Sequence, residues 1–319
     1  MDAAVEVLKK SGAAKAEKKA ARIAAEGIAK VAIDGNTAVV VEVNSETDFV
    51  AKNAIFQEFV QAVADKALKA GDGEDVVSIL DMKADLDDKI LKIGEKISIR
   101  RFEKVTADVV ASYIHGGGRI GVLVAGNGAS DDAAKEALTN IAMQIAAMNP
   151  QYISRDEISA DELAKMKEIT IGSALNDPFS LPKPVLSKLI EKAVAGVWSA
   201  EDVAIYEEKK SNMNFLPNFL SKEAKAQLAE IACADKEEIS GNKIFSGLVE
   251  GRISKQMKEI CLLDQGYVKA EDGKQSVAKY LESVSKDLTI TKMVRFEVGE
   301  GMEKKQEDFA AEVAAQING

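Results

Sequence analysis

The chain has very little of the chemistry that metal centres and disulfide frameworks require. Its 319 residues include one histidine, His115, and two cysteines, Cys233 and Cys261, which lie far apart in the sequence. A disulfide framework or a zinc site needs several closely spaced cysteines and histidines, so we predict neither, and we expect no cofactor. The sequence also lacks a G-x-x-x-x-G-K-[ST] segment, which argues against nucleotide hydrolysis by the chain itself.

Long apolar runs and an excess of positive charge are also missing. No apolar run approaches the roughly 20 residues that span a bilayer, and the N-terminus has no basic-then-apolar signal pattern. We therefore expect a cytoplasmic protein that does not bind membranes. The formal net charge is −10, which argues against DNA and RNA as partners because sequence-independent binding to nucleic acid needs a concentrated cationic surface.

One basic concentration interrupts this acidic background, in an Ala-rich segment near the N-terminus. It consists of Lys9, Lys10, Lys15, Lys18, Lys19 and Arg22. A solvated helix surface is the favoured interpretation, and a docking surface for an acidic partner is the alternative.

The first part of the chain has the pattern of a helix, a hairpin, two helices and a strand. Residues 2–26 favour a helix that Gly27 ends, and residues 28–43 read as a hairpin that turns at Asp34-Gly35. Residues 54–71 follow as a helix, then a helical stretch over 74–92 and a strand over 96–105. The apolar face expected for the helix over 54–71 consists of Ile55, Phe56, Phe59, Val60, Val63 and Ala67.

A similar order recurs further along the chain. Residues 109–126 predict a second hairpin with a triglycine turn, and residues 131–149 predict a helix with Ala137, Ile141, Ile145 and Met148 on one face. Residues 288–301 supply a strand and residues 304–317 a closing helix. The predicted fold class is α+β, with two tandem subdomains that each consist of an antiparallel sheet covered by helices.

These patterns predict four regions. Residues 1–27 form an N-terminal helix and linker, and residues 28–105 form the first subdomain. Residues 106–159 and 266–319 form the second subdomain, which a long, coiled-coil-like helical insertion over 160–265 interrupts. Within the insertion, prolines in "DPFSLPKP" and "NFLPNF" are expected to break the helices.

The glycines after His115 satisfy G-x-G-x-x-G, but they do not predict a dinucleotide site. That site requires the glycines to follow a strand and open a helix, whereas here they lie between two predicted strands. A tight turn explains them. No nearby motif supplies a nucleophile and an orienting carboxylate for His115, so we expect a structural or surface histidine and no catalytic triad.

The segment that joins the first hairpin to its helix leaves one question open. Ser45, followed three residues later by Asp48, matches a capping box. Phe49 and Val50 are then neighbours in the first helical turn, so their side chains point about 100° apart and cannot both face the centre of one narrow buried stripe. Large aromatic side chains are usually buried, which favours Phe49 as a core residue, but the periodicity does not decide between the two.

Several segments resemble the bacterial elongation factor Ts family. They are "IDGNTAVVV", "EVNSETDFVAKN", "KIGEKISIRR", "SYIHGGGRIGVLV", "LVEGRISKQMKEICLLDQGYV" and "MVRFEVGEGMEKKQEDFAAEVAAQ". They occur in the family's order and are spread over most of the chain. The segment around Thr47-Asp48-Phe49-Val50 and the RFEVGEG ending are the most specific.

The resemblance implies a guanine-nucleotide exchange factor that acts on elongation factor Tu, in its GDP-bound and nucleotide-free states, by binding and not as an enzyme. Thr47, Asp48, Phe49 and Val50 match the corner that enters the G-domain of the partner and dislodges Mg²⁺, with Phe49 as the wedge and Asp48 as its polar neighbour. The sequence makes no prediction about self-association.

Three further residues match contact positions of the family. Ile93 and Gly94, in "KIGEK", match positions that touch the same G-domain. His115 matches a histidine that contacts the partner close to its phosphate-binding loop.

The chain departs from the family pattern in two places. The family normally opens with a three-helix module of the ubiquitin-associated type, and the first residues here resemble only the last helix of that module. Roughly residues 173–238, which include Trp198, exceed what the commoner bacterial forms carry. We expect them to enlarge the helical protrusion.

Two other functions remain as alternatives. The basic N-terminal segment favours an RNA- or ribosome-binding translation accessory protein without exchange activity. A hydrolase that uses Glu46, Asp48 and His115 is the third hypothesis.

Overall fold

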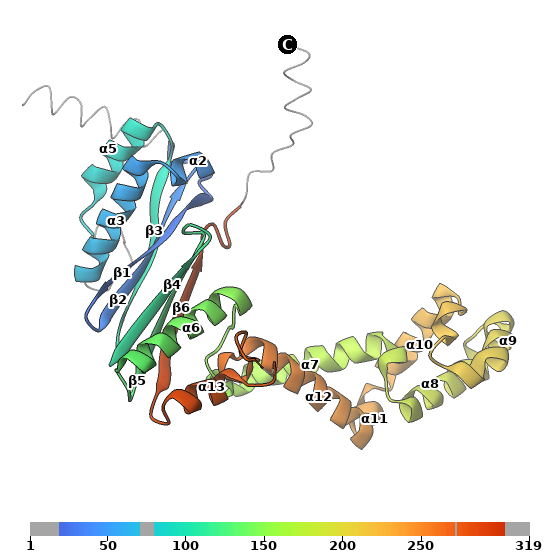
Figure 1. Cartoon of the computed structure of the whole chain (residues 1–319). Helices are drawn as coiled ribbons and strands as arrows, with labels where there is room; N and C mark the ends of the chain where they lie inside the picture. Colours follow the sequence, from blue (N-terminus) through green and yellow to red (C-terminus); the bar gives the residue numbers. More distant parts are fainter. Residues whose placement is uncertain (1–18, 71–79, 272, 304–319) are drawn as a thin grey trace, which may run out of the picture. The chain divides into compact units, whose positions relative to one another are not determined.

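The computed structural model describes residues 19–70, 80–271 and 273–303 (Figure 1). The chain divides into two compact units. Unit 1 combines two segments, Met1–Ile153 and Gln265–Gly319, and unit 2 is the single segment Ser154–Asp264. Unit 1 therefore holds both predicted sheets, and the chain of unit 2 runs between its two segments.

The first sheet of unit 1 consists of β1 (Glu26–Asp34), β2 (Thr37–Ser45) and β3 (Ile97–Thr106), paired antiparallel in this order. The helix α3 (Ala54–Lys69) packs against the sheet, with α5 (Lys83–Ile93) beside it (Figure 1). The short helix α2 (Asp48–Ala51) joins β2 to α3. The predicted strand over 96–105 is confirmed, and the helix over 54–71 is confirmed as far as Lys69. Residues 71–79 lie outside the described part, and the helix predicted over 74–92 is confirmed from Lys83 onwards but not over residues 80–82.

Helix α3 buries most of its predicted apolar face against this sheet. Phe56, Phe59, Val60, Val63 and Ala67 are all buried. Ile55 is 45% exposed, so its placement on the buried face is wrong. It directly precedes the buried Phe56 and therefore points about 100° away from it.

The first hairpin is confirmed, with Asp34 paired to Thr37 across a turn made by Gly35 and Asn36.

The predicted N-terminal helix spans residues 2–26, of which residues 2–18 lie outside the described part of the chain. It is wrong over residues 20–25, which are not helical. Gly27, predicted to end that helix, lies in β1 with a φ of +135°, and a Cβ there would come within 2.1 Å of the Val43 carbonyl oxygen. Gly27 thus permits a close strand contact.

The second sheet consists of β4 (Val109–His115), β5 (Ile120–Asn127) and β6 (Thr289–Glu297), again antiparallel and in this order. Helix α6 (Asp132–Met148) covers one face, and α13 (Val277–Val284) packs on α6. The α+β class with two small antiparallel sheets is therefore confirmed. The closing helix predicted over 304–317 lies outside the described residues.

The apolar face predicted for α6 is confirmed at Ala137, Ile141 and Ile145, which are buried. Met148 is 47% exposed, so its prediction is wrong. Met148 is the last residue of α6, and Asn149 ends the helix there with a left-handed φ of +46°.

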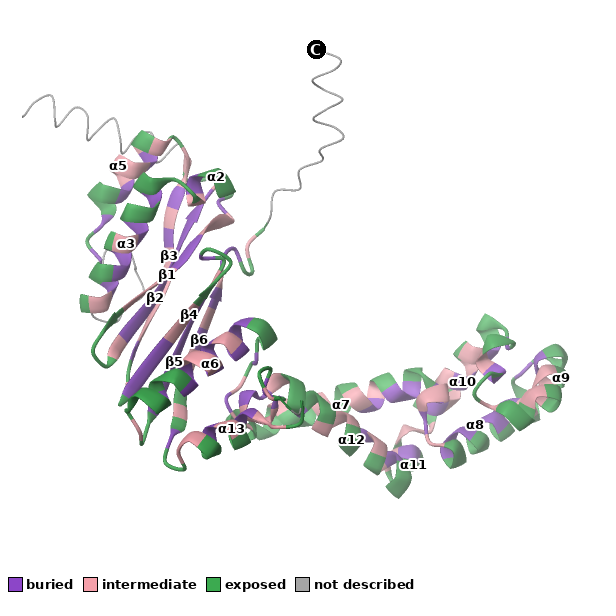
Figure 2. Cartoon of the chain, in the orientation of Figure 1, coloured by how far each residue is buried: buried purple, intermediate pink, exposed green. Residues whose placement is uncertain are grey.

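The two sheets pack on each other through the faces that their helices leave free. Side chains alternate between the two faces of a strand. In β2, Val39, Val41 and Val43 therefore face the helices, whereas Ala38 and Val40 face the second sheet. The second sheet contributes Val110, Leu123, Ala125, Val294 and Phe296 to this inter-sheet core. As Figure 2 shows, β2 is buried along almost its whole length.

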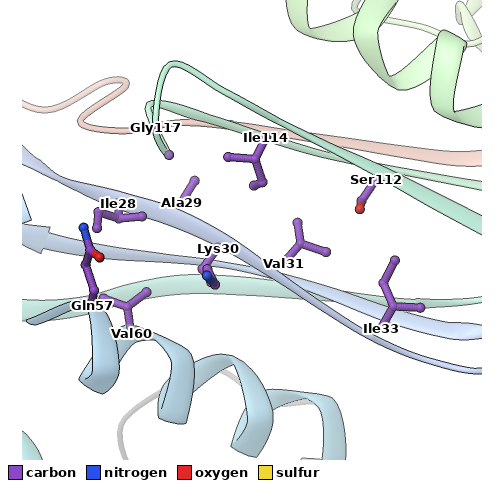
Figure 3. A pocket seen from close by; sticks show the side chains of 11 residues that line it. Ile28, Ala29, Lys30, Val31, Ile33, Gln57, Val60, Ser112, Ile114 and Gly117 are labelled. Atoms are coloured by element: carbon purple, nitrogen blue, oxygen red, sulfur yellow. The ribbon is translucent and has the colours of Figure 1, made fainter. Parts of the chain in front are cut away.

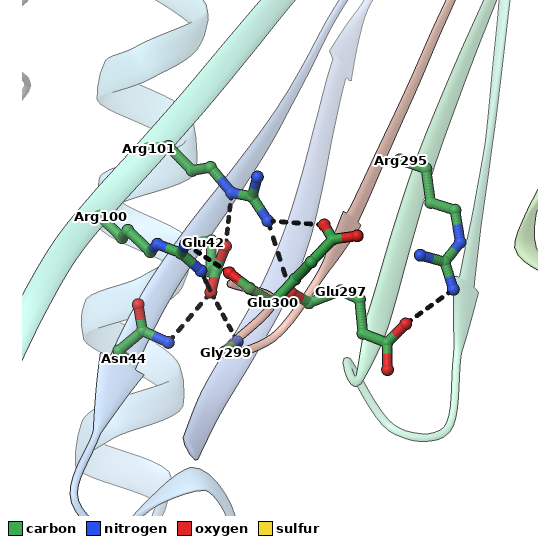
Figure 4. A network of polar contacts seen from close by, with 8 residues as sticks. All are labelled: Glu42, Asn44, Arg100, Arg101, Arg295, Glu297, Gly299 and Glu300. Atoms are coloured by element: carbon green, nitrogen blue, oxygen red, sulfur yellow. Dashed lines mark hydrogen bonds and ion pairs between the residues drawn. The ribbon is translucent and has the colours of Figure 1, made fainter. Parts of the chain in front are cut away.

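A fully buried carboxylate, that of Glu42 in β2, lies at one end of this inter-sheet core (Figure 4). Its Oε1 accepts hydrogen bonds from Arg100 at 2.9 Å, from the Asn44 side chain at 3.0 Å and from the Gly299 amide at 2.9 Å. Its Oε2 accepts from Nε of Arg101 at 2.6 Å. Gly299 follows β6, so this carboxylate joins the first sheet to the end of the second.

Burial by itself raises the pKa of a carboxyl group. At Glu42, the hydrogen bonds from Gly299, Asn44 and the two arginines outweigh that effect, so its pKa lies below its ordinary value. The guanidinium of Arg101 also lies over the Phe296 ring, 4.1 Å from its centroid. Residues 101–103 and 295–297 both read Arg-Phe-Glu, and this contact brings the two segments together in space.

Unit 2 is helical. Its α-helices are α7 (Ala160–Asn176), α8 (Lys183–Gly196), α9 (Ala200–Lys209), α10 (Lys222–Ala234), α11 (Lys236–Ser240) and α12 (Lys243–Ile260). Its short 3-10 helices are η1 (Arg155–Glu157), η2 (Pro178–Ser180), η3 (Lys210–Asn212), η4 (Leu216–Asn218) and η5 (Leu262–Asp264). Helix α7 packs against α10 and α12, and α8 packs against α10.

Pro178 and Pro217 act as predicted, because they lie in the 3-10 helices η2 and η4 between longer helices, whereas Pro184 lies in the first turn of α8 and does not interrupt that helix. Trp198 is buried, and its indole nitrogen donates to the Ala224 carbonyl at 2.9 Å. Among the described residues of both units, no helix has the length and apolar character that crossing a bilayer requires.

Replacing Glu42 by Gln tests the buried carboxylate. The substitution leaves two arginines without their anion, so the free energy of unfolding at neutral pH should fall by about 3–5 kcal/mol. Because the folded pKa of Glu42 is lowered, its contribution is complete above the unfolded pKa of about 4.3 and disappears as the pH falls through the folded value. Urea unfolding across the acid range measures both effects. A difference between wild type and E42Q that did not shrink with acid would contradict this account.

Candidate functional site

The corner formed by Thr47, Asp48, Phe49 and Val50 is the start of helix α2 (Figure 1). Thr47 is the N-cap residue, and its hydroxyl accepts a long hydrogen bond, 3.5 Å, from the Val50 amide. Ser45 instead belongs to β2, is fully buried, and donates its hydroxyl to the Thr47 carbonyl at 3.0 Å. The predicted capping box of Ser45 and Asp48 is therefore wrong, since the cap lies two residues later.

The cap lies at Thr47 because a carboxylate from another part of the chain, that of Glu95, binds the segment before α2. Glu95 accepts hydrogen bonds from the amides of Glu46 and Thr47, at 3.1 and 3.0 Å, and from the Thr47 hydroxyl at 2.7 Å. In return, the Glu46 carboxylate accepts from the Lys96 amide at 2.6 Å. The carboxylate of each segment thus accepts hydrogen bonds from backbone amides of the other segment. In a capping box, the acceptors come from side chains within the same helical turn. We call the contacts of these two carboxylates the Glu46–Glu95 clamp.

The two apolar residues of the corner point in different directions. Val50 is 8% exposed and belongs to the core of the first sheet, whereas Phe49 is 79% exposed. The interpretation of Phe49 as a core residue is therefore wrong. In Figure 2, α2 carries exposed residues on its outer side. The buried valine and the clamp together hold the aromatic ring in solvent.

Charged groups flank the exposed ring. The Asp48 carboxylate and the Lys52 ammonium form an ion pair of 2.8 Å one helical turn apart. This hydrogen bond from Lys52 lowers the pKa of the Asp48 carboxyl below its ordinary value. The same ammonium lies 6.0 Å from the Phe49 ring centroid. The corner therefore presents an aromatic surface beside one anionic and one cationic group.

Ile93 and Gly94 lie next to the corner, because Gly94 directly precedes Glu95 of the clamp. Gly94 ends α5 with a left-handed φ of +86°, which favours glycine, and its amide donates to the Ile90 carbonyl at 3.0 Å. Ile93 is partly buried against the core of the first sheet. The structure thus brings together every predicted site residue except His115.

His115 is the exposed last residue of β4, in the second sheet, and its Nδ1 lies 3.2 Å from the Tyr113 hydroxyl. The triglycine turn that follows docks on β1, where the Gly118 carbonyl accepts from the Ala29 amide at 2.7 Å. A Cβ on Gly118 would lie 2.4 Å from a methyl carbon of Ile28, so only glycine permits this approach. The interpretation of these glycines as a turn between strands is confirmed.

The three residues of the hydrolase hypothesis do not form a triad. Asp48 pairs with Lys52, Glu46 accepts from the Lys96 amide, and the His115 ring meets Tyr113. A triad requires direct hydrogen bonds from nucleophile to base and from base to carboxylate. These partners instead hold the three groups at separate structural positions.

Two members of the basic N-terminal segment fall in the described part of the chain, and both contact the surroundings of the corner. Arg22 forms an ion pair with Glu46 at 3.2 Å, and the Lys19 ammonium donates to the Gly94 carbonyl. The other four members lie outside the described residues.

No sequence pattern singles out Glu95. Its carboxylate is the group that orients the corner, yet it lies in a loop 48 residues from Thr47 in the sequence. The only trace in the sequence is its position, directly after the glycine that ends a helix.

A convex corner with one large exposed ring is suited to contact with another protein, because it places an aromatic anchor where a pocket of a partner can enclose it. Fold and site therefore define an α+β protein with an exposed aromatic corner that is suited to contact with another protein.

Comparison with known proteins identifies the family. The family model described as "Elongation factor TS" matches residues 46–300. Elongation factor Ts of Clostridioides difficile (strain 630) is similar over 331 residues at 39% identity, which covers 99% of this chain and 89% of that relative. The chain belongs to the elongation factor Ts family, and the resemblance seen in the sequence is confirmed. It is thus one of the elongation factors of protein biosynthesis.

Neighbouring substitutions in the corner should differ sharply in their effect on stability. Phe49→Ala removes an exposed ring and should change the free energy of unfolding by less than about 0.5 kcal/mol. Val50→Ala removes buried methyl groups and should lower it by roughly 1.5–2.5 kcal/mol. Urea unfolding of both variants measures the difference. Equal losses would mean that Phe49 is buried in solution.

Glu95→Ala should loosen the corner. The variant loses an ionised acceptor of three hydrogen bonds, so the free energy of unfolding should fall by about 1.5–3 kcal/mol. Hydrogen exchange at the Glu46 and Thr47 amides should accelerate well beyond the change at amides of the second sheet. Uniform acceleration across unit 1 would show that Glu95 contributes only to global stability. Asp48→Ala, which removes a solvent-exposed carboxylate of the same corner, is the matched control.

Proposed function

We propose that this chain is the guanine-nucleotide exchange factor of elongation factor Tu. It would bind the GDP complex, accelerate release of GDP and leave a nucleotide-free complex that GTP can enter. Membership of the elongation factor Ts family supports this role, which requires binding and no bond-making chemistry. We propose the cytoplasm, where translation takes place, as its location, and neither nucleic acid nor membrane as a partner.

The observation that supports a mechanism is the exposed ring of Phe49, held outwards by a buried neighbour and by the Glu46–Glu95 clamp. In the proposed mechanism, the corner enters the G-domain and Phe49 acts as a wedge that dislodges Mg²⁺. Asp48 is its polar neighbour, and Thr47 and Val50 fix its direction. Because the corner is ordered before binding, little conformational freedom is lost on docking.

The physical target of the wedge is the set of contacts that hold GDP. In GTPases, backbone amides of the phosphate-binding loop cradle the phosphates and Mg²⁺ neutralises their oxygens. A side chain that moves the elements beside the metal weakens both kinds of contact. Nucleotide affinity falls as a result, with no acid, base or nucleophile contributed by this chain.

Ile93, Gly94 and His115 would add contacts around the wedge. Ile93 and Gly94 adjoin the corner through Glu95, so we assign them to the same G-domain surface. We assign exposed His115 to a contact near the phosphate-binding loop. The triglycine turn supports this position, because its hydrogen bond to Ala29 fixes the end of β4 against the first sheet.

Exchange of this kind is a reciprocal coupling between two ligands of the GTPase. If the factor lowers nucleotide affinity, the nucleotide must lower the affinity of the factor by the same ratio. A coupling free energy of roughly 4 kcal/mol corresponds to about a thousandfold change in affinity. GTP binding would therefore expel the factor and complete the cycle.

Release of a fluorescent GDP analogue from purified elongation factor Tu tests the proposal. The wild-type chain should accelerate release well above the spontaneous rate. Phe49→Ala should reduce the acceleration by at least about tenfold, as expected for loss of an aromatic anchor. His115→Ala should cause a milder loss, and Ile169→Ala, which alters a residue 70% exposed in unit 2, should cause none.

The outcomes separate the parts of the proposal. No acceleration by the wild-type chain would reject the exchange function itself. Full acceleration by a folded Phe49→Ala variant would reject the wedge. Binding that weakened steeply with salt and was indifferent to Phe49→Ala would favour the RNA- or ribosome-binding alternative.

A further inference from the structure

A groove of about 460 Å³ lies along the free edge of β1 in unit 1 (Figure 3). Val31 and Ile33 of β1 line one side, and Ser112 and Ile114 of β4 line the other. Ile33 and Ile114 remain 45% and 37% exposed, so aliphatic carbon is accessible to solvent on both sides. The triglycine turn lines one end of the groove, where Gly118 meets β1.

The backbone along this groove has unused hydrogen-bonding capacity. Among the described strands, β1 lies at the edge of its sheet and pairs with β2 alone. The Ala29 amide points away from β2, because it donates to Gly118. Backbone groups alternate in direction along a strand, so those of Val31 and Ile33 point to the same open side. Within the described residues, neither accepts or donates a backbone hydrogen bond there.

One cationic side chain, that of Lys30, lies on this open edge. Lys30 lines the groove between Ala29 and Val31, and its side chain is half-buried. Its ammonium has no ion pair or side-chain hydrogen bond within the described part of the chain. Because faces alternate along a strand, Lys30 points to the opposite side of β1 from Val31 and Ile33.

We propose that this groove binds an extended segment of a partner protein, which adds to β1 as a further strand and alternates aliphatic with acidic side chains. Its backbone would pair with Val31 and Ile33, as in other cases of strand addition. Its aliphatic side chains would enter the space beside Val31, Ile33 and Ile114. Its acidic side chains, on the other face, would meet Lys30.

This inference goes beyond nucleotide exchange. Neither the corner nor Ile93 and Gly94 line the groove. The groove adjoins the triglycine turn that follows His115, so a segment bound there would lie beside the surface proposed to face the GTPase. A lysine on an edge strand can also serve only to discourage uncontrolled strand pairing. In that case no segment of the proposed pattern would bind.

A capped peptide of alternating valine and glutamate, five residues long, is the probe for the full-length chain. It should bind saturably and slow hydrogen exchange at the Val31 and Ile33 amides. A version with methylated backbone nitrogens on its pairing edge should not bind. Lys30→Glu should weaken binding by about fivefold, since one exposed ion pair is replaced by repulsion. The same variant should gain affinity for the matching valine–lysine peptide.

Two pairs of variants complete the test. Ile33→Pro removes the outward amide, whereas Ile33→Ala keeps it, so the proline variant should lose more affinity. Lys286→Glu reverses an exposed charge far along the chain and should have no effect. Unfolding midpoints establish that each variant is folded. Equal binding of the methylated peptide, unchanged affinity after Lys30→Glu, or unaltered exchange at Val31 and Ile33 would each overturn the proposal.

Discussion

The position of the Phe49 ring depends on the hydrogen bonds of two carboxylates. Glu95 accepts from backbone amides beside Glu46, and Glu46 accepts from the backbone amide that follows Glu95. A helix start has amides without intrahelical partners, and they must be satisfied if the turn is to be ordered. Glu95 supplies acceptors for the turn before α2, and Glu46 supplies one for the start of β3. Because the end of β2 is joined in this way to the end of α5, Val50 is fixed inwards and Phe49 outwards.

A third carboxylate, that of the fully buried Glu42, serves a comparable purpose on a larger scale. Glu42 collects donors from β2, from β3 and from the segment after β6, which are distant in sequence. An uncompensated charge in this position would be strongly unfavourable. The arginines and the Gly299 amide must therefore be in place together, which links correct docking of the two sheets to folding of the whole unit.

Much of the fold could be predicted because its hydrophobic periodicity is local. The hairpins, α3, α6 and the pattern of two sheets follow from alternation, helical spacing and turn residues. Periodicity could not predict the direction of Phe49, because two adjacent apolar residues satisfy the same helical pattern, and only the resemblance to the family implied an exposed ring. The direction depends on Glu95, and a contact between residues far apart in sequence leaves no periodic pattern. The errors at Ile55 and Met148 lie at helix ends, where a stripe of apolar residues can extend beyond its buried part.

The exposure of Phe49 has an energetic consequence for the unbound protein. An aromatic side chain of this size gains roughly 1.5–3 kcal/mol when it leaves water for an apolar environment. Folding of this chain alone forgoes nearly all of that gain at position 49, since four-fifths of the residue remains hydrated. This transfer free energy is gained only when another molecule encloses the ring. The exposed ring therefore contributes a favourable term to association.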